Sequence, residues 1–316
     1  MNLKYFMSGA SGIRAEVMPA VASLIKYRLL SMHRSFKGNT KVWCAISHHK
    51  DSAMREVMLD SGAFTAFTKG QVVTLDELTA QYDEVIRIIN PKLQLWFINL
   101  DVIPGAYGRI ASPTEIDQAL EASDKNYKAL RKRYGSRVLP VYHQTEGIQR
   151  LRTIARMNDF VAFGFRQDFA EQDRIGHAEE TLAEARRIRP GVRVHGLATT
   201  GYKMLKRTSF DTVDSASWLY SAAMGGILYI GSDLTIADVS ISNESPQQRV
   251  PRGHFNNFTK DEREHIVDQI EKAGATLAQV QSDLSYRILV NAYTMREWVA
   301  AWQPPKLKPN IGLFPL

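Results

Sequence analysis

Three aspartates in this sequence stand directly after short apolar runs, where strands are expected to end. Asp60 and Asp101 close the runs 56–59 and 95–100, and Asp214 lies just beyond a third run. The carboxyl ends of the strands in a parallel barrel meet at one rim, so we expect these three carboxylates to lie close together. A lone strand-end aspartate is also typical of a helix N-cap, so the grouping, and not any single residue, indicates a site.

Paired carboxylates at such a rim can act on a glycosidic bond. One carboxylate attacks the anomeric carbon of a sugar or stabilises its positive charge, and the other transfers a proton. A third carboxylate beside an aromatic ring can bind the edge and the face of a purine. Because hydrolysis and base exchange use the same pair of groups, this pattern alone leaves both reactions open.

The elements that must position these aspartates alternate along the chain. The apolar runs that we interpret as strands occupy residues 4–7, 41–46, 56–59, 95–100, 138–142, 160–164, 192–197 and 210–213. Most are continuously apolar, as strands covered on both faces are. Amphipathic helices are predicted between them, at 74–90 after a capping box, from Ser112 onward, and at about 172–188.

Eight strands that alternate with helices predict an α/β fold of the (β/α)8 TIM-barrel type. The alternation is also compatible with an open, doubly wound sheet, and a ninth apolar run at 227–230 exceeds the expected count. After about residue 245 a polar connector leads to helical stretches at about 259–274 and 276–302. We therefore expect a barrel over residues 1–244 and, packed on it, a helical C-terminal extension over 245–316.

Composition sets the broad class of the protein. The single cysteine among 316 residues excludes a disulfide framework and a zinc site of several thiolates, and fits a reducing compartment. The sequence has neither an apolar leader nor a stretch of about 18 apolar residues, so we expect a cytoplasmic protein with no membrane partner. The net charge of +7 favours an anionic partner, nucleic acid above all.

Other polar clusters have simpler interpretations. His195 by itself is typical of a hydrogen-bonded histidine of a core or rim. The set Cys44, His48, His49 and Asp51 matches no strong ligand spacing and is better interpreted as a solvated loop. No P-loop, no dinucleotide-binding G-x-G-x-x-G after a strand and no G-x-S-x-G elbow is present. We expect no cofactor and no bound metal.

Four motifs resemble those of the tRNA-guanine transglycosylases. "DSGAF" at 60–64 is similar to their D-S-G-G-[FY] motif, and "FDTVDS" at 210–215 is similar to their second aspartate motif. "NLDVIP" at 99–104 and "HGLATTG" at 195–201 resemble two further segments of the family. The order and the strand placement agree over about residues 55–220, roughly half the chain. The two aspartate motifs are the specific part of this resemblance.

The resemblance implies a role for each matching residue. Asp214 is implied as the nucleophile that forms a covalent glycosyl-enzyme intermediate, and Asp60 as the group that transfers the proton. Asp101 would bind the purine edge with the help of Ser61, and Phe64 would stack on the base. Backbone at Gly62 would approach the base closely. The remaining residues implied in the substrate pocket are Gln144, Gly164 and His195.

Departures from the family point to one of its branches. The family's zinc needs three cysteines after the nucleophile strand, and this chain has none there; its basic P-T-R segment is replaced by "ASWLYSAA" at 216–223. Ala198 stands where the family has a methionine under the base. These differences resemble the 7-deazaguanine DNA transglycosylases of phages and bacterial genomic islands. They imply a pentosyltransferase that exchanges guanine in DNA for a 7-deazaguanine, in the host's cytoplasm if the chain is phage-encoded.

Basic residues just before the nucleophile strand fit such a partner. Lys203, Lys206 and Arg207 are the preferred contacts to a DNA phosphate, although basic clusters are also typical of solvated helix faces. A guanine inside a duplex cannot reach a barrel pocket, so the base must be flipped out or the strand single. Exchange in tRNA, a TIM-barrel glycoside hydrolase using Asp60 and Asp214, and an inactive nucleic-acid-binding barrel stay open as alternatives. A homodimer is possible.

Overall fold

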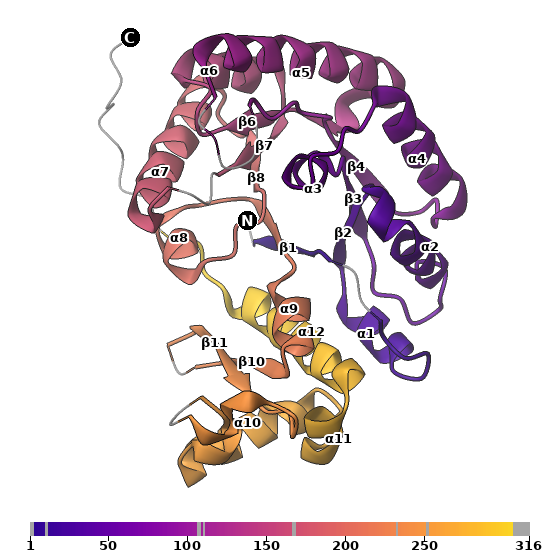
Figure 1. Cartoon of the computed structure of the whole chain (residues 1–316), viewed down its shortest axis with the longest axis vertical. Helices are drawn as coiled ribbons and strands as arrows, with labels where there is room; N and C mark the ends of the chain where they lie inside the picture. Colours follow the sequence, from indigo (N-terminus) through magenta and orange to yellow (C-terminus); the bar gives the residue numbers. More distant parts are fainter. Residues whose placement is uncertain are drawn as a thin grey trace.

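A ring of parallel strands forms the centre of the structure, a computed structural model that describes residues 3–9, 12–105, 109, 111–165, 169–231, 233–250 and 253–305. β1 pairs with β2 on one side and with β9 on the other, so the sheet curls round on itself (Figure 1). The strands of the ring are β1 (Lys4–Met7), β2 (Tyr27–Ser31), β3 (Glu56–Asp60), β4 (Gln94–Ile98), β5 (Val138–Leu139), β6 (Val141–His143), β7 (Phe160–Gly164), β8 (Arg193–Gly196) and β9 (Thr212–Ser215).

The nine labelled strands form an eight-stranded barrel, because β5 and β6 are two halves of one strand. Pro140 separates them, since proline has no N–H to donate to a ladder. β5 pairs with β4 and β6 pairs with β7, while the Pro140 carbonyl still accepts a hydrogen bond of 2.9 Å from the N–H of Ala162. The predicted (β/α)8 fold is therefore confirmed. The doubly wound alternative is wrong, because β5 and β6 stand at the two ends of the strand order and are consecutive halves of one strand, which closes the sheet.

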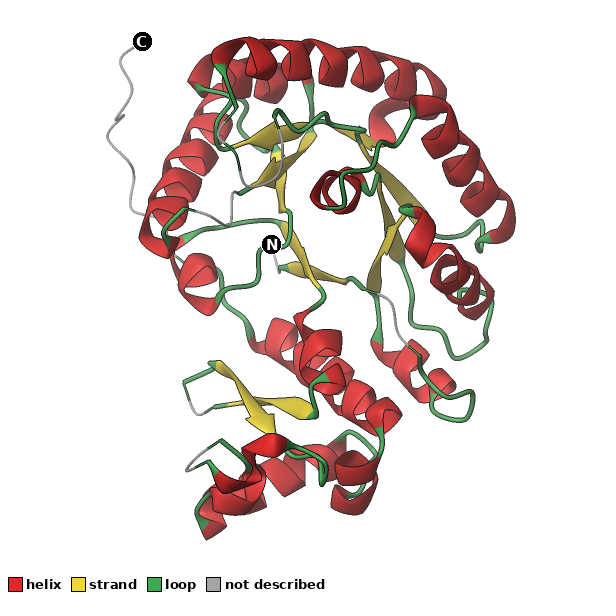
Figure 2. Ribbon diagram, viewed as in Figure 1, coloured by secondary structure: helices red, strands yellow, loops and turns green. Residues whose placement is uncertain are grey.

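Most helices surround the ring of strands, while the short α3 lies within the outline of the ring in this view (Figures 1 and 2). They begin where the sequence supplies caps: capping boxes open α4 at Thr74 and α5 at Ser112, as predicted. None of the described helices is long and apolar enough to cross a membrane. Their bounds are α1 (Met18–Leu24), α2 (Lys37–Ile46), α3 (Ala63–Thr68), α4 (Leu75–Ile88), α5 (Pro113–Tyr134), α6 (Ile148–Met157), α7 (Glu171–Ile188), α8 (Tyr202–Arg207) and α9 (Ser217–Ala223), with short 3-10 turns at η1 (Arg34–Phe36) and η2 (Gly135–Arg137).

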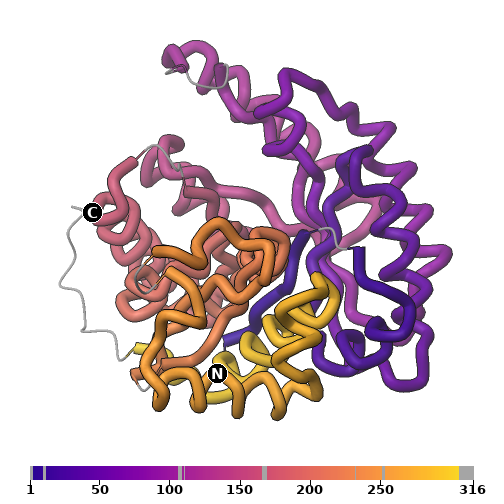
Figure 3. Tube along the Cα trace, turned by 60° about the horizontal axis from the view of Figure 1, so that its bottom comes forward, coloured from indigo at the N-terminus to yellow at the C-terminus, as the bar shows by residue number. Residues whose placement is uncertain are grey.

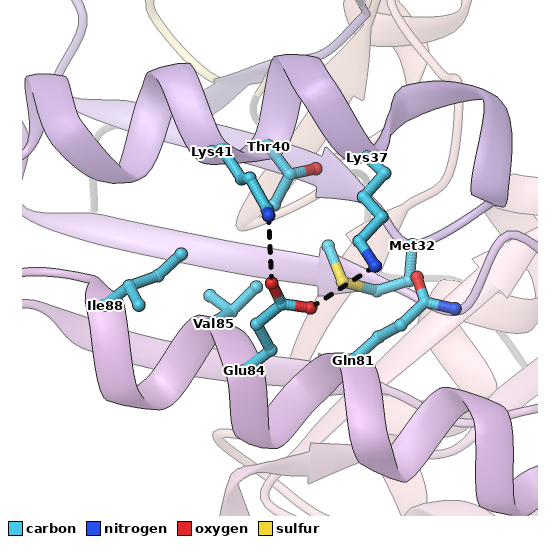
Figure 4. Close-up of a pocket in the computed structure, with 8 residues that line it drawn as sticks. All are labelled: Met32, Lys37, Thr40, Lys41, Gln81, Glu84, Val85 and Ile88. Atoms are coloured by element: carbon cyan, nitrogen blue, oxygen red, sulfur yellow. Dashed lines mark ion pairs between the residues drawn. The ribbon is translucent and has the colours of Figure 1, made fainter.

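The expected second strand at 41–46 is wrong, because these residues belong to α2. Buried Thr40, Trp43 and Cys44 are spaced for one face of a helix. Lys37 and Lys41 lie one turn apart on α2. Their ammonium groups form ion pairs with the carboxylate of Glu84 in α4, at N–O distances of 3.9 and 3.4 Å (Figure 4). The true second strand is β2, whose sequence contains Arg28 and so lacks a continuous apolar run.

Side chains of the strands alternate between the barrel interior and the surrounding helices. The interior cluster consists of Phe6, Leu29, Met58, Ile98, Leu139, Val141, Phe160 and Ala162. Their immediate neighbours along the strands, such as Val57 and Val213, belong to the outer core beneath the helices. Because successive strand residues face opposite ways, Asp60 shares the inward face of Met58, and Asp214 faces opposite to Val213. The pleat alone therefore turns both carboxylates into the mouth of the barrel.

The ninth apolar run lies outside the barrel, in a hairpin of β10 (Gly226–Ile230) and β11 (Ile236–Ser240). This hairpin shares a second apolar core with the C-terminal helices, including Ile227, Val239, Ile266 and Val290. Figure 3 shows these segments, in orange and yellow, gathered on one side of the barrel. They are η3 (Pro246–Arg249), η4 (Phe255–Asn257), α10 (Lys260–Lys272), α11 (Leu277–Ser282) and α12 (Leu284–Ala301), and residues 306–316 of the expected extension lie outside the described residues.

A buried cation fixes the chain as it leaves β1. Arg28 is fully buried, and its guanidinium donates to the carbonyls of Met7, at 2.7 Å, and of Gly9. The same group lies 4.2 Å from the ring centre of Trp43, where a cation–π attraction replaces a carboxylate partner. Burial lowers the pKa of Arg28 to about 9, which leaves it charged at neutral pH. Trp218 adds a hydrogen bond of 3.0 Å to the Ser8 carbonyl between these two anchors.

We expect Arg28→Met to lower the free energy of unfolding by about 2–5 kcal/mol, because it leaves buried carbonyls without donors. Urea unfolding followed by tryptophan fluorescence measures this change, since Trp43 lies against the guanidinium. Arg55→Met, at an exposed arginine, is the control and should change stability by less than about 0.5 kcal/mol. Equal effects of the two substitutions would contradict the anchoring role.

Candidate active site

A cavity of about 420 Å³ opens at the carboxyl ends of the barrel strands. This size lies in the range of small-molecule sites. Three predicted carboxylates, Asp60, Asp101 and Asp214, all line it. The other described residues of its wall are Ser8, Gly9, Leu29, Ser31, Phe36, Asn39, Ser61, Phe64, Thr65, Ile98, Ile103, His143, Gly164, Phe165, Leu197 and Ala198.

Asp214, on β9, is the most firmly held of the three carboxylates. Its side chain is buried, and its Oδ1 accepts hydrogen bonds from the Ala198 N–H at 2.9 Å and from His195 Nε2 at 3.2 Å. Both bonds end on Oδ1, and Oδ2 has no hydrogen bond from the described residues. One oxygen is therefore fixed in place while the other is available to a substrate.

His195 lies beneath this carboxylate and not in the cavity wall. Its imidazole is completely buried between Asp214 and Thr212, whose hydroxyl is 2.8 Å from Nδ1. With Nε2 donating to a carboxylate, Nδ1 accepts the hydroxyl proton, so these two neighbours define the tautomer. The expectation of a hydrogen-bonded rim histidine agrees with this position. His195 orients Asp214 and does not line the space where a substrate would lie.

Asp60, at the end of β3, has a strongly perturbed acidity. Burial and the charges of Asp214 and Asp101 raise its pKa to about 7, while hydrogen bonds from Ser31 and the Gly62 N–H oppose the rise. The Gly62 N–H lies 3.2 Å from Oδ2. A carboxyl group with a pKa near 7 can both release and accept a proton at neutral pH, which is what a proton-transfer group requires.

Asp101 faces the cavity together with a residue that sequence reasoning passed over. His143, the last residue of β6, places Nε2 at 2.7 Å from Oδ2 of Asp101. The signal for His143 was present in the strand alternation: Val141 faces the barrel interior, so His143, two residues later, must do the same. Gln144 does not line the cavity; its Oε1 is buried without a hydrogen-bond partner among the described residues.

The remaining residues of the predicted pocket have mixed placements. Ser61 and Phe64 line the cavity, and the Phe64 side chain is 61% exposed, so its ring is free to stack on a ligand. Gly62 has a positive φ of 76°, and a Cβ there would approach the backbone nitrogen of His33 to 2.7 Å. Its role is thus packing against its own fold, and not close approach to a base. Gly164 lines the wall beside His143.

The predicted phosphate contacts lie away from the cavity wall and already have partners. Lys203 bonds Glu171 at 2.9 Å, and Arg207 bonds Glu179 at 2.8 Å through Nε. The ammonium of Lys206 lies 4.4 Å from the ring centre of Tyr202. All three side chains are on α8 and its end, at the surface. A phosphate would have to replace carboxylate partners at two of them.

The cysteine–histidine set near residue 44 forms no site. Cys44 is buried in α2, and the neighbouring His48 bonds the Ile88 carbonyl at 3.1 Å. Among the described residues no group of three or more histidine, cysteine, aspartate or glutamate side chains is arranged to hold a metal ion.

The raised pKa of Asp60 predicts a stability cost that depends on pH. The pKa of Asp60 is near 3.8 in the unfolded chain and near 7 in the folded one. Ionisation of Asp60 therefore lowers the free energy of unfolding progressively as the pH rises from 3.8 to 7, and this loss is constant above pH 7. We expect Asp60→Asn to add about 2 kcal/mol more to the free energy of unfolding at pH 8 than at pH 5. Urea unfolding at the two pH values measures it, with the exposed Asp117→Asn as control. A gain independent of pH would show that the pKa is not raised.

No protein-family model matches the chain, and no curated protein matches it either. The chemistry of the cavity must therefore be argued from its own residues.

Proposed function

We propose that this chain is a base-exchange transglycosylase that replaces guanine in DNA with a 7-deazaguanine through a covalent aspartyl-glycosyl intermediate. The observation that supports it most is the pairing of Asp214 with Asp60 in one cavity. Asp214 has one fixed and one available oxygen, and the pKa of Asp60 is raised to about 7. A nucleophile and a proton carrier are the two groups that exchange at a glycosidic bond requires.

In the first step, Oδ2 of Asp214 attacks C1′ of the deoxyribose. The bond from C1′ to N9 breaks, and its electron pair leaves with the guanine. Asp60 gives its proton to the leaving base, so that neutral guanine departs and Asp60 becomes an anion. The Ala198 N–H and His195 keep Oδ1 in place while Oδ2 forms the new bond.

In the second step, the incoming 7-deazaguanine occupies the same space. The Asp60 carboxylate takes the proton from N9, and N9 attacks C1′ as the bond to Asp214 breaks. Asp60 is protonated again and Asp214 is restored, so the cycle needs no other reactant. A pKa near 7 suits Asp60 for both steps, because neither protonation state is strongly disfavoured.

DNA is the proposed polymer because the missing zinc cysteines and the segment at 216–223 depart from the tRNA enzymes and resemble the DNA-acting branch, and because the net charge is +7. The carboxylates lie inside the barrel mouth, so a guanine must leave the stack to reach them. Phe64 supplies an exposed ring for that base. The same carboxylate pair would also serve exchange in tRNA, or hydrolysis of a glycoside if water replaced the incoming base.

The proposal predicts that labelled 7-deazaguanine enters single-stranded DNA when both are incubated with the protein. Parallel reactions with tRNA, and with DNA but no free base, test the alternatives: label in tRNA would replace the DNA assignment, and release of guanine without uptake would indicate hydrolysis. No label in either polymer would overturn the exchange proposal.

Substitution of each of the two aspartates should impair a different step of the exchange reaction. Asp214→Asn should abolish the covalent protein–DNA adduct seen on a denaturing gel, because the amide cannot act as the nucleophile. Asp60→Asn should lower the exchange rate at least about a hundredfold, since it removes proton transfer. Asp117→Asn, on the outer face of α5, should leave both readouts unchanged. Full exchange by Asp60→Asn would contradict its role.

A further inference from the structure

A second cavity, of about 260 Å³, lies between the first strand of the barrel and the last helix of the chain. Its lining residues come from β1, from the end of α1 and the start of β2, and from α12. This outer cavity shares no lining residue with the candidate active site. The two cavities are therefore separate, and none of the carboxylates proposed for the exchange reaction takes part in the outer one.

The floor of the outer cavity is the outward face of β1. Leu3, Tyr5 and Met7 line it, and all three are buried in the core beneath the helices. Phe6, between the last two, points the other way into the barrel. The hydroxyl of Tyr5 is already bonded to the Ser215 carbonyl at 3.2 Å. The floor therefore offers mainly apolar surface to a ligand.

The opposite wall of the outer cavity belongs to α12. Met295 and Val299 both line it, four residues apart and so on one face of the helix. The thioethers of Met7 and Met295 face the same space from strand and helix, and such flexible side chains adapt to the shape of a ligand. An apolar cavity of about 150 Å³ is enough to hold benzene. The outer cavity, at about 260 Å³, has room for a somewhat larger molecule.

One charged group of the outer cavity has no partner. Lys26 lines the cavity and is exposed, and its ammonium forms no ion pair with any residue that the structure describes. Lys26 lies two residues before Arg28, whose guanidinium donates to the Met7 carbonyl, so the alternation of the strand places both cations on the β1 side. Arg296, the other cation of the wall, is paired with Glu297 at 2.7 Å.

We propose that the outer cavity binds a small aliphatic carboxylate, with its chain between β1 and α12 and its carboxylate at the ammonium of Lys26. The apolar floor and helix wall suit an alkyl chain, which gains free energy by leaving water. An anion is favoured over a neutral molecule, because Lys26 is unpaired and no carboxylate of the described residues lines the cavity. An empty cavity costs stability, and a ligand that fills it stabilises the folded chain.

The first test measures binding of butanoate, hexanoate and octanoate to the full chain by calorimetry, at neutral pH and low salt. Affinity should rise about fourfold for each added CH₂ group until the cavity is full. Hexanoate should bind about threefold to fivefold more tightly than hexanamide, which has the same chain without the charge. The melting temperature should rise with the concentration of octanoate.

Two substitutions test the two halves of the site. Lys26→Met removes the charge, so hexanoate and hexanamide should bind with affinities within about 1.5-fold of each other. Lys92→Met, at an exposed lysine that does not line the cavity, is its control and should keep the preference. Val299→Trp fills the cavity and should abolish binding of both compounds. Ala301→Trp, at an exposed position outside the wall, should leave binding unchanged.

The results that would overturn the proposal are distinct from those that bear on base exchange. A wild type that does not bind octanoate, or whose affinity does not grow with chain length, would overturn it. Binding that survives in a folded Val299→Trp variant would place the carboxylate elsewhere and would also overturn it. Should Val299→Trp fail to fold, an undiminished preference for hexanoate in Lys26→Met would decide against the site. None of these measurements depends on exchange activity.

Discussion

The pairing of the first strand with the last is the constraint on which the structure depends. β1 and β9 lie side by side from Lys4 opposite Thr212 to Met7 opposite Ser215, so residues more than two hundred positions apart share a ladder. The Ser8 N–H continues it with a bond of 3.0 Å to the Ser215 carbonyl. Without this closure β9 would be an edge strand, and Asp214 would face water and not a cavity wall. The cost of closing so long a loop grows only slowly with its length.

Closure also creates an electrostatic problem, because it gathers carboxylates in one enclosed space. Each of the three carboxylates is accommodated in a different way. Asp101 is paired with His143, Asp214 accepts two N–H donors, and Asp60 relieves the repulsion by holding its proton to about pH 7. Groups of one chemical kind thereby acquire unlike properties, which is how enzyme sites assign separate roles to similar residues.

The sequence predicted the parts of this molecule that depend on local pattern. Strand-end aspartates and capping boxes are local, and Asp60, Asp101 and Asp214 meet as expected. The strand β2 was not predicted because Arg28 interrupts its apolar run. The burial of the Arg28 guanidinium beside two tryptophans depends on tertiary contacts, which local sequence does not reveal. Likewise, Lys203 and Arg207 looked available because their partners, Glu171 and Glu179, lie about thirty residues away on another helix. Gln144 was predicted to line the pocket, but His143 lines it instead. The prediction was wrong by one residue, and a shift of one residue moves a side chain to the opposite face of a strand.

The position of α12 has a consequence for how the chain is made. This last helix packs on α1, α9 and β10, and its Asn291 bonds both the Leu228 N–H and the Trp218 carbonyl. A ribosome adds about 5–20 residues per second, so α1 emerges tens of seconds before the helix that covers it. During that interval the apolar side of α1 faces the cell without its cover. Translation speed and chaperone access therefore act on this protein before the stability of the finished barrel can protect it.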